Sequence, residues 1–474
     1  PEDALALERR AAEELLVSGH VDRGMDVLTR VLAHFGLGFS PSRPRALVWV
    51  LLLRAWLFVR GLGFRPRPPQ ELSPTALLPL DVGFSASMGL AVVDTMLALP
   101  FATRTLLRSL AVGDTFRVCR ALCIELSFVA SEGLPARAKV DRYCQRLGEL
   151  AGAIDAPDVH ALVWASTAMA MHFRGDFRAA AEGMTRGLSV YSESLGQAPP
   201  SASAGGQGRF FSQRWELATF RYFSLAAMVQ LGDLAEASRL RDAYAREARE
   251  RGNLYLYTNL TIGDTNLLYL AADRPDEAEA VVRAAMEGWS QRAFQMQHWW
   301  ELQALCHADL YRGRGPEALA RMELAYGRLV RSLLTRVQYL RLRAWHLRGR
   351  AALATCRAVG TAEAQRLLRG AQRDAERIER EGAPWATPMA LLLRGGLAAR
   401  RGAQDEARRN AEEAARGFEA VGMVAWAAAA SWAASWAHSD GGLPARRAAE
   451  ARLAARGVVR PARFAAMLAP GYER

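Results

Sequence analysis

The sequence predicts an all-α fold, built as a solenoid of antiparallel helix pairs with a period of about 42 residues. One observation is compositional: Ala, Leu and Arg dominate, β-branched residues are sparse, and no segment alternates apolar and polar residues over the length of a strand. Another is a turn motif that recurs at nearly constant spacing. The third is length, because 474 residues would ordinarily form two or three globular domains, whereas a solenoid grows by adding repeats.

The recurring motif is a short turn followed by Glu-Ala or a close variant, and its clearest copy is Gly232–Ala237. Such a turn joins two antiparallel helices in tetratricopeptide-type repeats, where the small Ala lets the helices approach closely. The variants are Gly175–Ala180, Asp273–Ala278, Gly315–Ala318, Gly360–Ala364 and Gly402–Ala407. The one long step between copies contains a Gly/Ser/Ala/Pro-rich spacer at 196–208, which predicts a surface loop.

The first third, residues 1–155, lacks the Glu-Ala signature and predicts degenerate repeats. Helical periodicity and turn residues predict helices at Ala4–Ser18, Val21–Phe35, Ala46–Arg60, Ala86–Leu97, Thr103–Ala111, Phe116–Glu132 and Ala136–Ala153. Five prolines in Phe64–Asp81 favour an extended connector. The apolar run Ala46–Val59 is too short to span a bilayer, so we expect a buried helix, with membrane contact as the less favoured alternative. Asp94, in an otherwise apolar helix, is expected to pair with a neighbouring Arg rather than to act as a buried acid of raised pKa.

Residues 156–422 predict regular hairpins. Their first helices are expected at Val159–Arg174, Phe210–Leu231, Leu254–Ala272, Phe294–Arg312, Leu334–Ala354 and Trp385–Arg400. Their second helices are expected at Phe177–Ser194, Leu234–Arg251, Asp276–Gln291, Pro316–Ser332, Ala362–Glu381 and Asp405–Val421. Residues 423–474 predict capping helices at Met423–Ala437, Pro444–Gly457 and Pro461–Leu468, because a terminal repeat must shield the exposed core.

The sequence contains none of the catalytic motifs that we searched for. Lys139 is the only Lys and follows Ala138, so no G-x-x-x-x-G-K-[ST] phosphate loop occurs. Protein-kinase and hydrolase signatures are also missing, and the five cysteines form no zinc-binding pair. We therefore expect no catalytic residue, no metal and no cofactor, and the free cysteines favour a reduced, cytoplasmic location. The net charge of +12 is carried almost entirely by Arg and is weak support for nucleic-acid binding.

Candidate partner-binding residues lie mainly on the predicted first helices, which line the concave side of such solenoids. Trp and His side chains can anchor a partner, and Arg336, Arg343 and Arg350 step by seven along one helical stripe suited to an acidic partner. Core packing and pairing with acids of adjacent repeats are the alternatives. The predicted binding residues are Arg214, Glu216, Asn259, Asp264, Asn266, Gln297, His298, Trp299, Arg336 and Arg343.

Several segments resemble the C-terminal helical-repeat region of large bacterial serine/threonine protein kinases of the myxobacterial type. The segments are Ala11–Leu37, Leu52–Phe64, Asp81–Asp94, Arg214–Gly232, Trp289–His298, Arg331–Gln338 and Pro461–Gly471. In that family a kinase domain is followed by a STAND-like ATPase and then by this region. The resemblance implies that Pro1 begins just after the ATPase and that Arg474 is the natural end. No kinase or ATPase residue transfers to this chain, because none of their motifs occurs in it.

Two functions remain open at this point. The first is a non-catalytic sensor and scaffold that binds a protein or small ligand and regulates an attached kinase and ATPase in signal transduction, without contact with a membrane. The alternative is an Arg-rich repeat that binds nucleic acid, as transcription regulators do, and it predicts binding that weakens steeply with salt.

Overall fold

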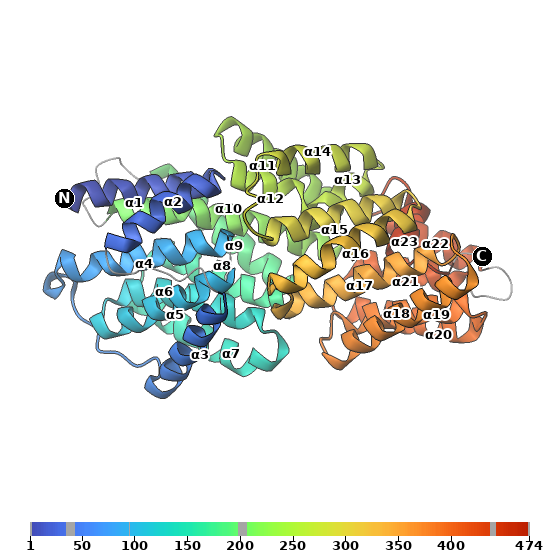
Figure 1. Cartoon of the computed structure of the whole chain (residues 1–474), viewed down its shortest axis with the longest axis horizontal. Helices are drawn as coiled ribbons and strands as arrows, with labels where there is room; N and C mark the ends of the chain where they lie inside the picture. The colour runs from blue at the N-terminus through green and yellow to red at the C-terminus, as the bar shows by residue number, and fades with distance from the viewer. Residues whose placement is uncertain (1, 35–42, 94, 198–205, 437–441, 473–474) are drawn as a thin grey trace.

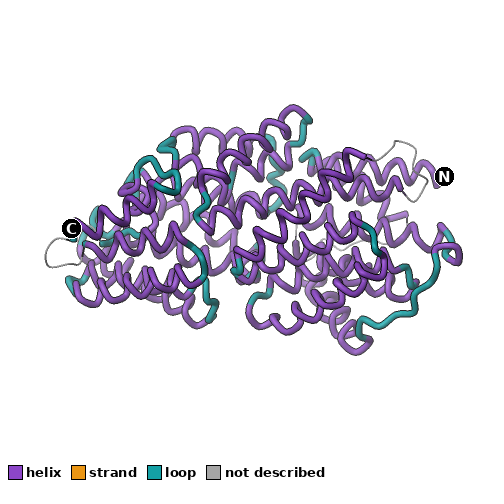
Figure 2. The backbone as a smooth tube through the Cα atoms, turned by 180° about the vertical axis from the view of Figure 1, so that it is seen from behind, coloured by secondary structure: helices purple, strands orange, loops and turns teal. Residues whose placement is uncertain are grey.

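The computed structural model describes residues 2–34, 43–93, 95–197, 206–436 and 442–472, and within them every regular element is a helix (Figure 2). The predicted all-α class is therefore confirmed. Asp94 and most of the 196–208 spacer lie outside the described residues. The described ends of the spacer are helical, because α9 extends to Gln197 and α10 begins at Gly206.

The first third forms seven α-helices: α1 Glu2–Val17, α2 Val21–His34, α3 Arg43–Arg60, α4 Pro74–Val93, α5 Thr95–Val112, α6 Thr115–Ser131 and α7 Arg137–Ile154. The prediction of an extended connector at Phe64–Asp81 was wrong beyond Ser73, because α4 begins at Pro74. Ser73 caps this helix, since its Oγ accepts a hydrogen bond from the Ala76 amide at 3.3 Å, and proline is favoured at a first helical position. Pro79 removes one intrahelical hydrogen bond, which the burial of apolar neighbours such as Leu80 and Val82 offsets.

The helices expected at Ala86–Leu97 and Thr103–Ala111 left a gap around Pro100, which was also wrong, because α5 continues through that residue. Eight of its residues between Ala98 and Leu110 are buried, and packing against α3, α4 and α6 outweighs the one hydrogen bond that the proline ring removes.

The remaining helices follow the predicted hairpins closely. They are α8 Pro157–Arg174, α9 Phe177–Gln197, α10 Gly206–Leu231, α11 Leu234–Glu250, α12 Leu254–Thr261, α13 Leu267–Ala271, α14 Pro275–Glu287, α15 Met296–Tyr311, α16 Gly315–Arg331, α17 Gln338–Thr355, α18 Thr361–Arg380, α19 Thr387–Arg400, α20 Gln404–Ala420, α21 Val424–Ser435, α22 Leu443–Ala454 and α23 Pro461–Leu468. The single helix expected at Leu254–Ala272 is instead interrupted by the 3-10 turn Gly263–Asn266, and α17 is preceded by the 3-10 turn Leu334–Arg336.

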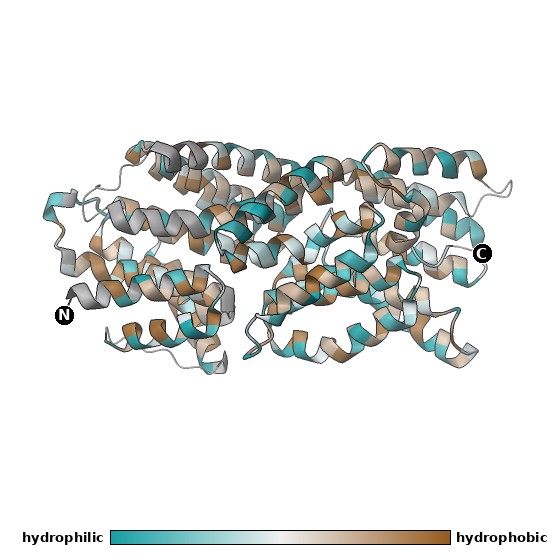
Figure 3. Ribbon diagram, turned by 90° about the horizontal axis from the view of Figure 1, so that it is seen from above, coloured by the Kyte–Doolittle hydropathy of each residue, from teal (hydrophilic) through white to brown (hydrophobic). Residues whose placement is uncertain are grey.

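The molecule is elongated, with the two ends of the chain at opposite ends of its long axis (Figure 1). Most helices that follow one another in sequence pack side by side, as in a solenoid, whereas α3 packs mainly on α5. Hydrophilic and hydrophobic residues are mixed along most helices (Figure 3).

Segments distant in the sequence contact each other, so successive turns of the superhelix pack together. We call this arrangement the closed superhelix. The α1–α2 hairpin contacts the middle of the chain: the Leu254 amide donates to Ser18 O at 3.2 Å, and Ser290 Oγ donates to Asp22 Oδ1 at 2.6 Å. Further along the chain, the Leu134 amide donates to Gln338 Oε1 at 3.0 Å. Repeats therefore also contact parts of the chain that are far away in the sequence.

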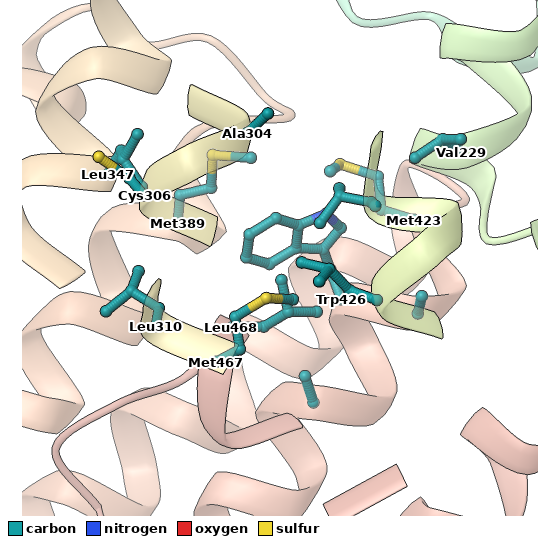
Figure 4. Close-up of a cluster of buried hydrophobic side chains, with 14 of the residues drawn as sticks. Val229, Ala304, Cys306, Leu310, Leu347, Met389, Met423, Trp426, Met467 and Leu468 are labelled. Carbon is teal, nitrogen blue, oxygen red and sulfur yellow. The ribbon is translucent and has the colours of Figure 1, made fainter. Parts of the chain in front are cut away.

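The C-terminal helices return to earlier repeats rather than extending outward. The Val459 amide donates to Ala271 O at 2.8 Å, and Arg463 Nε donates to Tyr311 O at 2.9 Å. Figure 4 shows the core that results, in which Trp426 is surrounded by side chains from α10, α15, α17, α19 and α23. The predicted division at residues 155 and 422 stays a prediction.

Candidate functional site

The break between α12 and α13 places a carboxylate in the interior of the protein. Gly263 has φ +67°, in the left-handed region, and a Cβ there would lie 2.9 Å from Cγ of Trp300, so the turn is suited to glycine. Asn266 stabilises the break, because its Nδ2 donates to Thr261 O and Ala278 O, both at 3.0 Å. Asp264 follows the glycine and is only 3% exposed.

Asp264 is fully paired within the protein. It receives hydrogen bonds from Gln303 Nε2 at 2.9 Å, Arg343 Nη1 at 2.9 Å and the Tyr339 hydroxyl at 3.3 Å, and a second bond from Arg343 Nη2 makes the pair bidentate. Burial disfavours the charged guanidinium, but Asp264 and Tyr339 together raise the pKa of Arg343 above its usual value. This ion pair is structural, since its donors and acceptor satisfy one another.

Aromatic and basic side chains surround the ion pair. His172 lies 5.1 Å from the Tyr339 ring and 5.3 Å from the rings of Phe177 and Phe223 (distances between centroids). Arg350, on the same face of α17 as Arg343, contacts His307 Nε2 at 2.8 Å and donates to Met467 O at 3.1 Å. Burial, with the charge of Arg343, lowers the pKa of Arg350 to about 9.

We expect the free energy of unfolding to decrease as the pH falls from about 6.5 to about 4, partly because of His172. Burial lowers the pKa of His172 to about 4. In the unfolded chain an imidazole titrates near 6.5, so between these values the unfolded state binds a proton that the folded state excludes. Each pH unit within the window costs about 1.4 kcal/mol for such a histidine.

Denaturant titrations at pH 7 and pH 5 should show that His172→Phe reduces this loss of stability, whereas replacing the partly exposed His160 of the same helix by Gln does not. An unchanged loss in His172→Phe would contradict the assignment.

A cavity of about 180 Å³ adjoins the polar core, between α4, α6, α8, α10, α12 and α15. Most of its wall is apolar. The apolar lining residues are Phe84, Met88, Ala91, Ile124, Phe128, Leu162, Met169, Phe173, Phe220, Phe223, Met296, Trp300 and Val337, and the polar ones are Arg120, Cys123, Ser127, Ser131, Ser166, Glu216, Thr219, Tyr255 and Gln297. An apolar cavity with a few polar groups is the usual form of a small-molecule site.

Arg120 is the polar group that sets this cavity apart. Its side chain is 6% exposed, and its guanidinium carbon lies 3.6 Å above the centre of the Phe84 ring. Its Nε is buried without a hydrogen-bond acceptor, and it forms no ion pair with any residue that the structure describes. Cation–π contact compensates part of the cost of burying this charge, but a charge in an apolar wall is ordinarily paired with an anion.

The structure places most of the predicted binding residues inside the molecule rather than on an open groove. Eight of them are between 1% and 8% exposed: Glu216, Asn259, Asp264, Asn266, Gln297, His298, Trp299 and Arg343. Arg336 is exposed in the turn before α17, so it does not continue the stripe of Arg343 and Arg350. Arg214 lies on α10, and its side chain is outside the described part of the structure.

Of the predicted residues whose side chains the structure describes, Glu216 and Gln297 line the cavity. Gln297 joins the cavity to the polar core, because its Nε2 donates to Asn259 Oδ1 at 3.2 Å. His298 instead closes the start of α15, where its Nδ1 accepts from the Gln295 amide at 3.1 Å, and burial lowers its pKa to about 4. Within the described residues no three His, Cys, Asp or Glu side chains are grouped as a metal site would require.

Sequence reasoning missed Arg120, although a signal was present. On α6, Arg120, Ile124, Ser127 and Ser131 recur at helical spacing, and all line the cavity. The same helix carries buried Cys119 and Cys123, so its periodicity already placed Arg120 beside the buried face.

Comparisons with known proteins add little. No family model and no curated protein matches the chain. Among solved structures, the Rap protein complexed with competence and sporulation factor is similar over 96% of this chain and 99% of that chain, with 9% sequence identity and a TM-score of 0.39. That likeness is too distant to assign a function.

Proposed function

We propose that this chain is a non-catalytic, ligand-sensing helical-repeat domain whose cavity binds a small apolar molecule carrying a carboxylate. The observation that carries the proposal is Arg120, a buried cation in the wall of an apolar cavity that forms no ion pair with any acid in the described part of the chain. A ligand carboxylate would accept hydrogen bonds from the guanidinium, and its apolar part would lie against the aromatic and Met side chains.

The volume limits the ligand. An apolar cavity of about 150 Å³ holds benzene, so this one fits a single ring or a short chain with a carboxylate. Binding here would favour the closed arrangement of the repeats, because the wall is formed by α4 and α6 from the first third together with α10, α12 and α15 from the middle.

We expect phenylacetate to bind in isothermal titration calorimetry and to raise the melting temperature. Arg120→Gln should weaken binding about tenfold to a hundredfold, since a charge-assisted hydrogen bond contributes about 1.5–3 kcal/mol. Arg186→Gln is a matched control, because Arg186 also stacks at 3.6 Å on an aromatic ring, that of Trp164, but is exposed on α9. Phenethylamine, of similar shape and opposite charge, should not bind. Equal binding of both compounds, or equal loss in both variants, would contradict the proposal.

The resemblance to kinase-linked repeats suggests where the signal goes. We propose that ligand binding in the cavity regulates a serine/threonine kinase and a STAND-type ATPase in the same parent protein. If so, phenylacetate should change phosphotransfer by that protein, and the response should disappear in Arg120→Gln while basal activity stays unchanged.

The nucleic-acid alternative has less support. Arg343 and Arg350, two members of the predicted basic stripe, are 8% and 2% exposed and cannot reach phosphates. Tight, steeply salt-dependent DNA or RNA binding would favour it instead.

A further inference from the structure

Helix α3 presents an unusual exposed surface. Seven large apolar side chains on it are exposed: Val48 56%, Trp49 59%, Leu51 63%, Leu52 58%, Trp56 61%, Phe58 83% and Val59 78%. They are more than half of the exposed large hydrophobic residues in the described chain. The expectation of a buried helix at Ala46–Val59 was therefore wrong, because only Ala46, Val50 and Leu57 of α3 are buried. We call the seven exposed side chains the α3 face. Singly exposed apolar residues are ordinary, but a contiguous set marks an interaction surface.

The helix is fixed to the body of the protein by its opposite side. Arg54 lies 3.4 Å (Nε to Oε1) from Glu125, a fully buried carboxylate that also accepts from Thr103 Oγ1 at 2.9 Å, and it forms a second ion pair with Glu132. Leu57 packs in the hydrophobic core with side chains of α5 and α6. The α3 face therefore points away from the repeats, and α3 lies along the lower edge of the molecule (Figure 1).

Several Arg side chains near this face are not paired with described acids. Residues 43–70 and helix α5, which packs on α3, contain no Asp or Glu. Arg45, Arg65 and Arg67 are exposed, and none of them forms an ion pair with a residue that the structure describes. Half-buried Arg104 and Arg108 on α5 add further charge, and they too are unpaired with any described acid.

These features select among the possible occupants of the face. A second copy is disfavoured, because two-fold pairing would bring basic ends of α3 together with no acid between them. A transmembrane arrangement is also disfavoured, since no described helix is both long and apolar enough to cross a bilayer. A protruding apolar helix with two Trp seven residues apart and basic flanks has the composition of an interfacial membrane anchor.

We propose that α3 binds the surface of a membrane rich in anionic phospholipid, lying in the interface with the α3 face toward the acyl chains. Arg45, Arg65 and Arg67 contact lipid phosphates at the rim. This replaces the sequence-based expectation of no membrane partner, and it is independent of the cavity.

Flotation of the whole chain with vesicles tests the proposal. We expect binding to vesicles of phosphatidylcholine mixed with phosphatidylglycerol, and binding at least about tenfold weaker to phosphatidylcholine alone or at high salt. The double variant Trp56→Ser/Phe58→Ser should lose binding by a similar factor. Both residues are exposed, so the fold should persist, which circular dichroism checks.

Two further variants separate the apolar contribution from the charge. Arg65→Glu/Arg67→Glu should weaken binding to the anionic vesicles only. Leu324→Ser is the matched control, because Leu324 is 86% exposed on α16, and it should leave binding unchanged. Brominated lipids should quench Trp fluorescence in the wild type and much less in Trp56→Ser/Phe58→Ser.

Three outcomes would overturn the proposal. One is no flotation with the anionic vesicles at low salt, and another is equal loss of binding in Leu324→Ser. The third is concentration-dependent dimerisation in analytical ultracentrifugation that Trp56→Ser/Phe58→Ser abolishes without any vesicle binding, which would assign the α3 face to a second copy.

Discussion

Replacing Asp264 by Asn should lower the free energy of unfolding by about 3–5 kcal/mol, the usual cost of removing one partner from a buried ion pair. The Arg343 guanidinium would remain in the interior, where Asp264 now accepts its bidentate hydrogen bonds. Asn keeps the shape of the side chain but not its charge, so most of the loss would come from the uncompensated cation. Guanidinium denaturation followed by circular dichroism measures the change.

Two controls make the Asp264 result specific. Glu236→Gln removes the acid of an exposed pair with Arg239, three residues away on one helix, and should leave stability nearly unchanged. The double variant Asp264→Leu/Arg343→Met removes both charges and should recover much of the lost stability, since an apolar replacement of a buried pair is often tolerated. A double variant as unstable as Asp264→Asn would contradict the explanation.

Replacing Gly175 by Ala should destabilise the protein by about 2–5 kcal/mol, from backbone strain together with a steric clash. Gly175 ends α8 at φ +82°, and a Cβ there would lie 2.0 Å from Cδ1 of Trp385, in the loop that precedes α19. Trp385 is 1% exposed, so the ring has little room to move. The clash is between adjacent superhelical turns, and it therefore measures how tightly the turns are closed.

Gly402 provides the matched control for this substitution. It ends α19 at φ +80°, but a Cβ there would meet no atom within 4 Å. Gly402→Ala should therefore cost only the strain, about 1–2 kcal/mol. If the two variants unfolded at the same denaturant concentration, adjacent turns would not be in contact at Gly175.

The repeats could be predicted from the sequence because their signals are local. The Gly turn and small Ala of each hairpin are adjacent in sequence, and the helices after Val159 begin and end close to where those residues predict. The N-terminal third was less predictable. Prolines ordinarily end helices, and only the burial of α4 and α5 explains why Pro79 and Pro100 do not.

The closed superhelix could not be predicted, because it depends on how small rotations between repeats add along the chain. Nothing near Gly133 in sequence indicates that Gln338 lies against it. The burial of the predicted binding residues could not be predicted for the same reason. Polar side chains on first helices, such as Asp264 and Gln297, were expected to line an open groove, but nearby repeats bury them: Gln297 bonds to Asn259, and Asp264 pairs with Arg343.

Hydrogen exchange at the amides of Leu134 and Val459 is the most direct test of the closed superhelix. Each donates its hydrogen bond across a turn contact, to Gln338 Oε1 and to Ala271 O, rather than within its own helix. If the turns are closed, both amides should exchange as slowly as the core of α17, and phenylacetate should slow them further. Rapid exchange at both amides, with α17 still protected, would show an open solenoid and contradict the account.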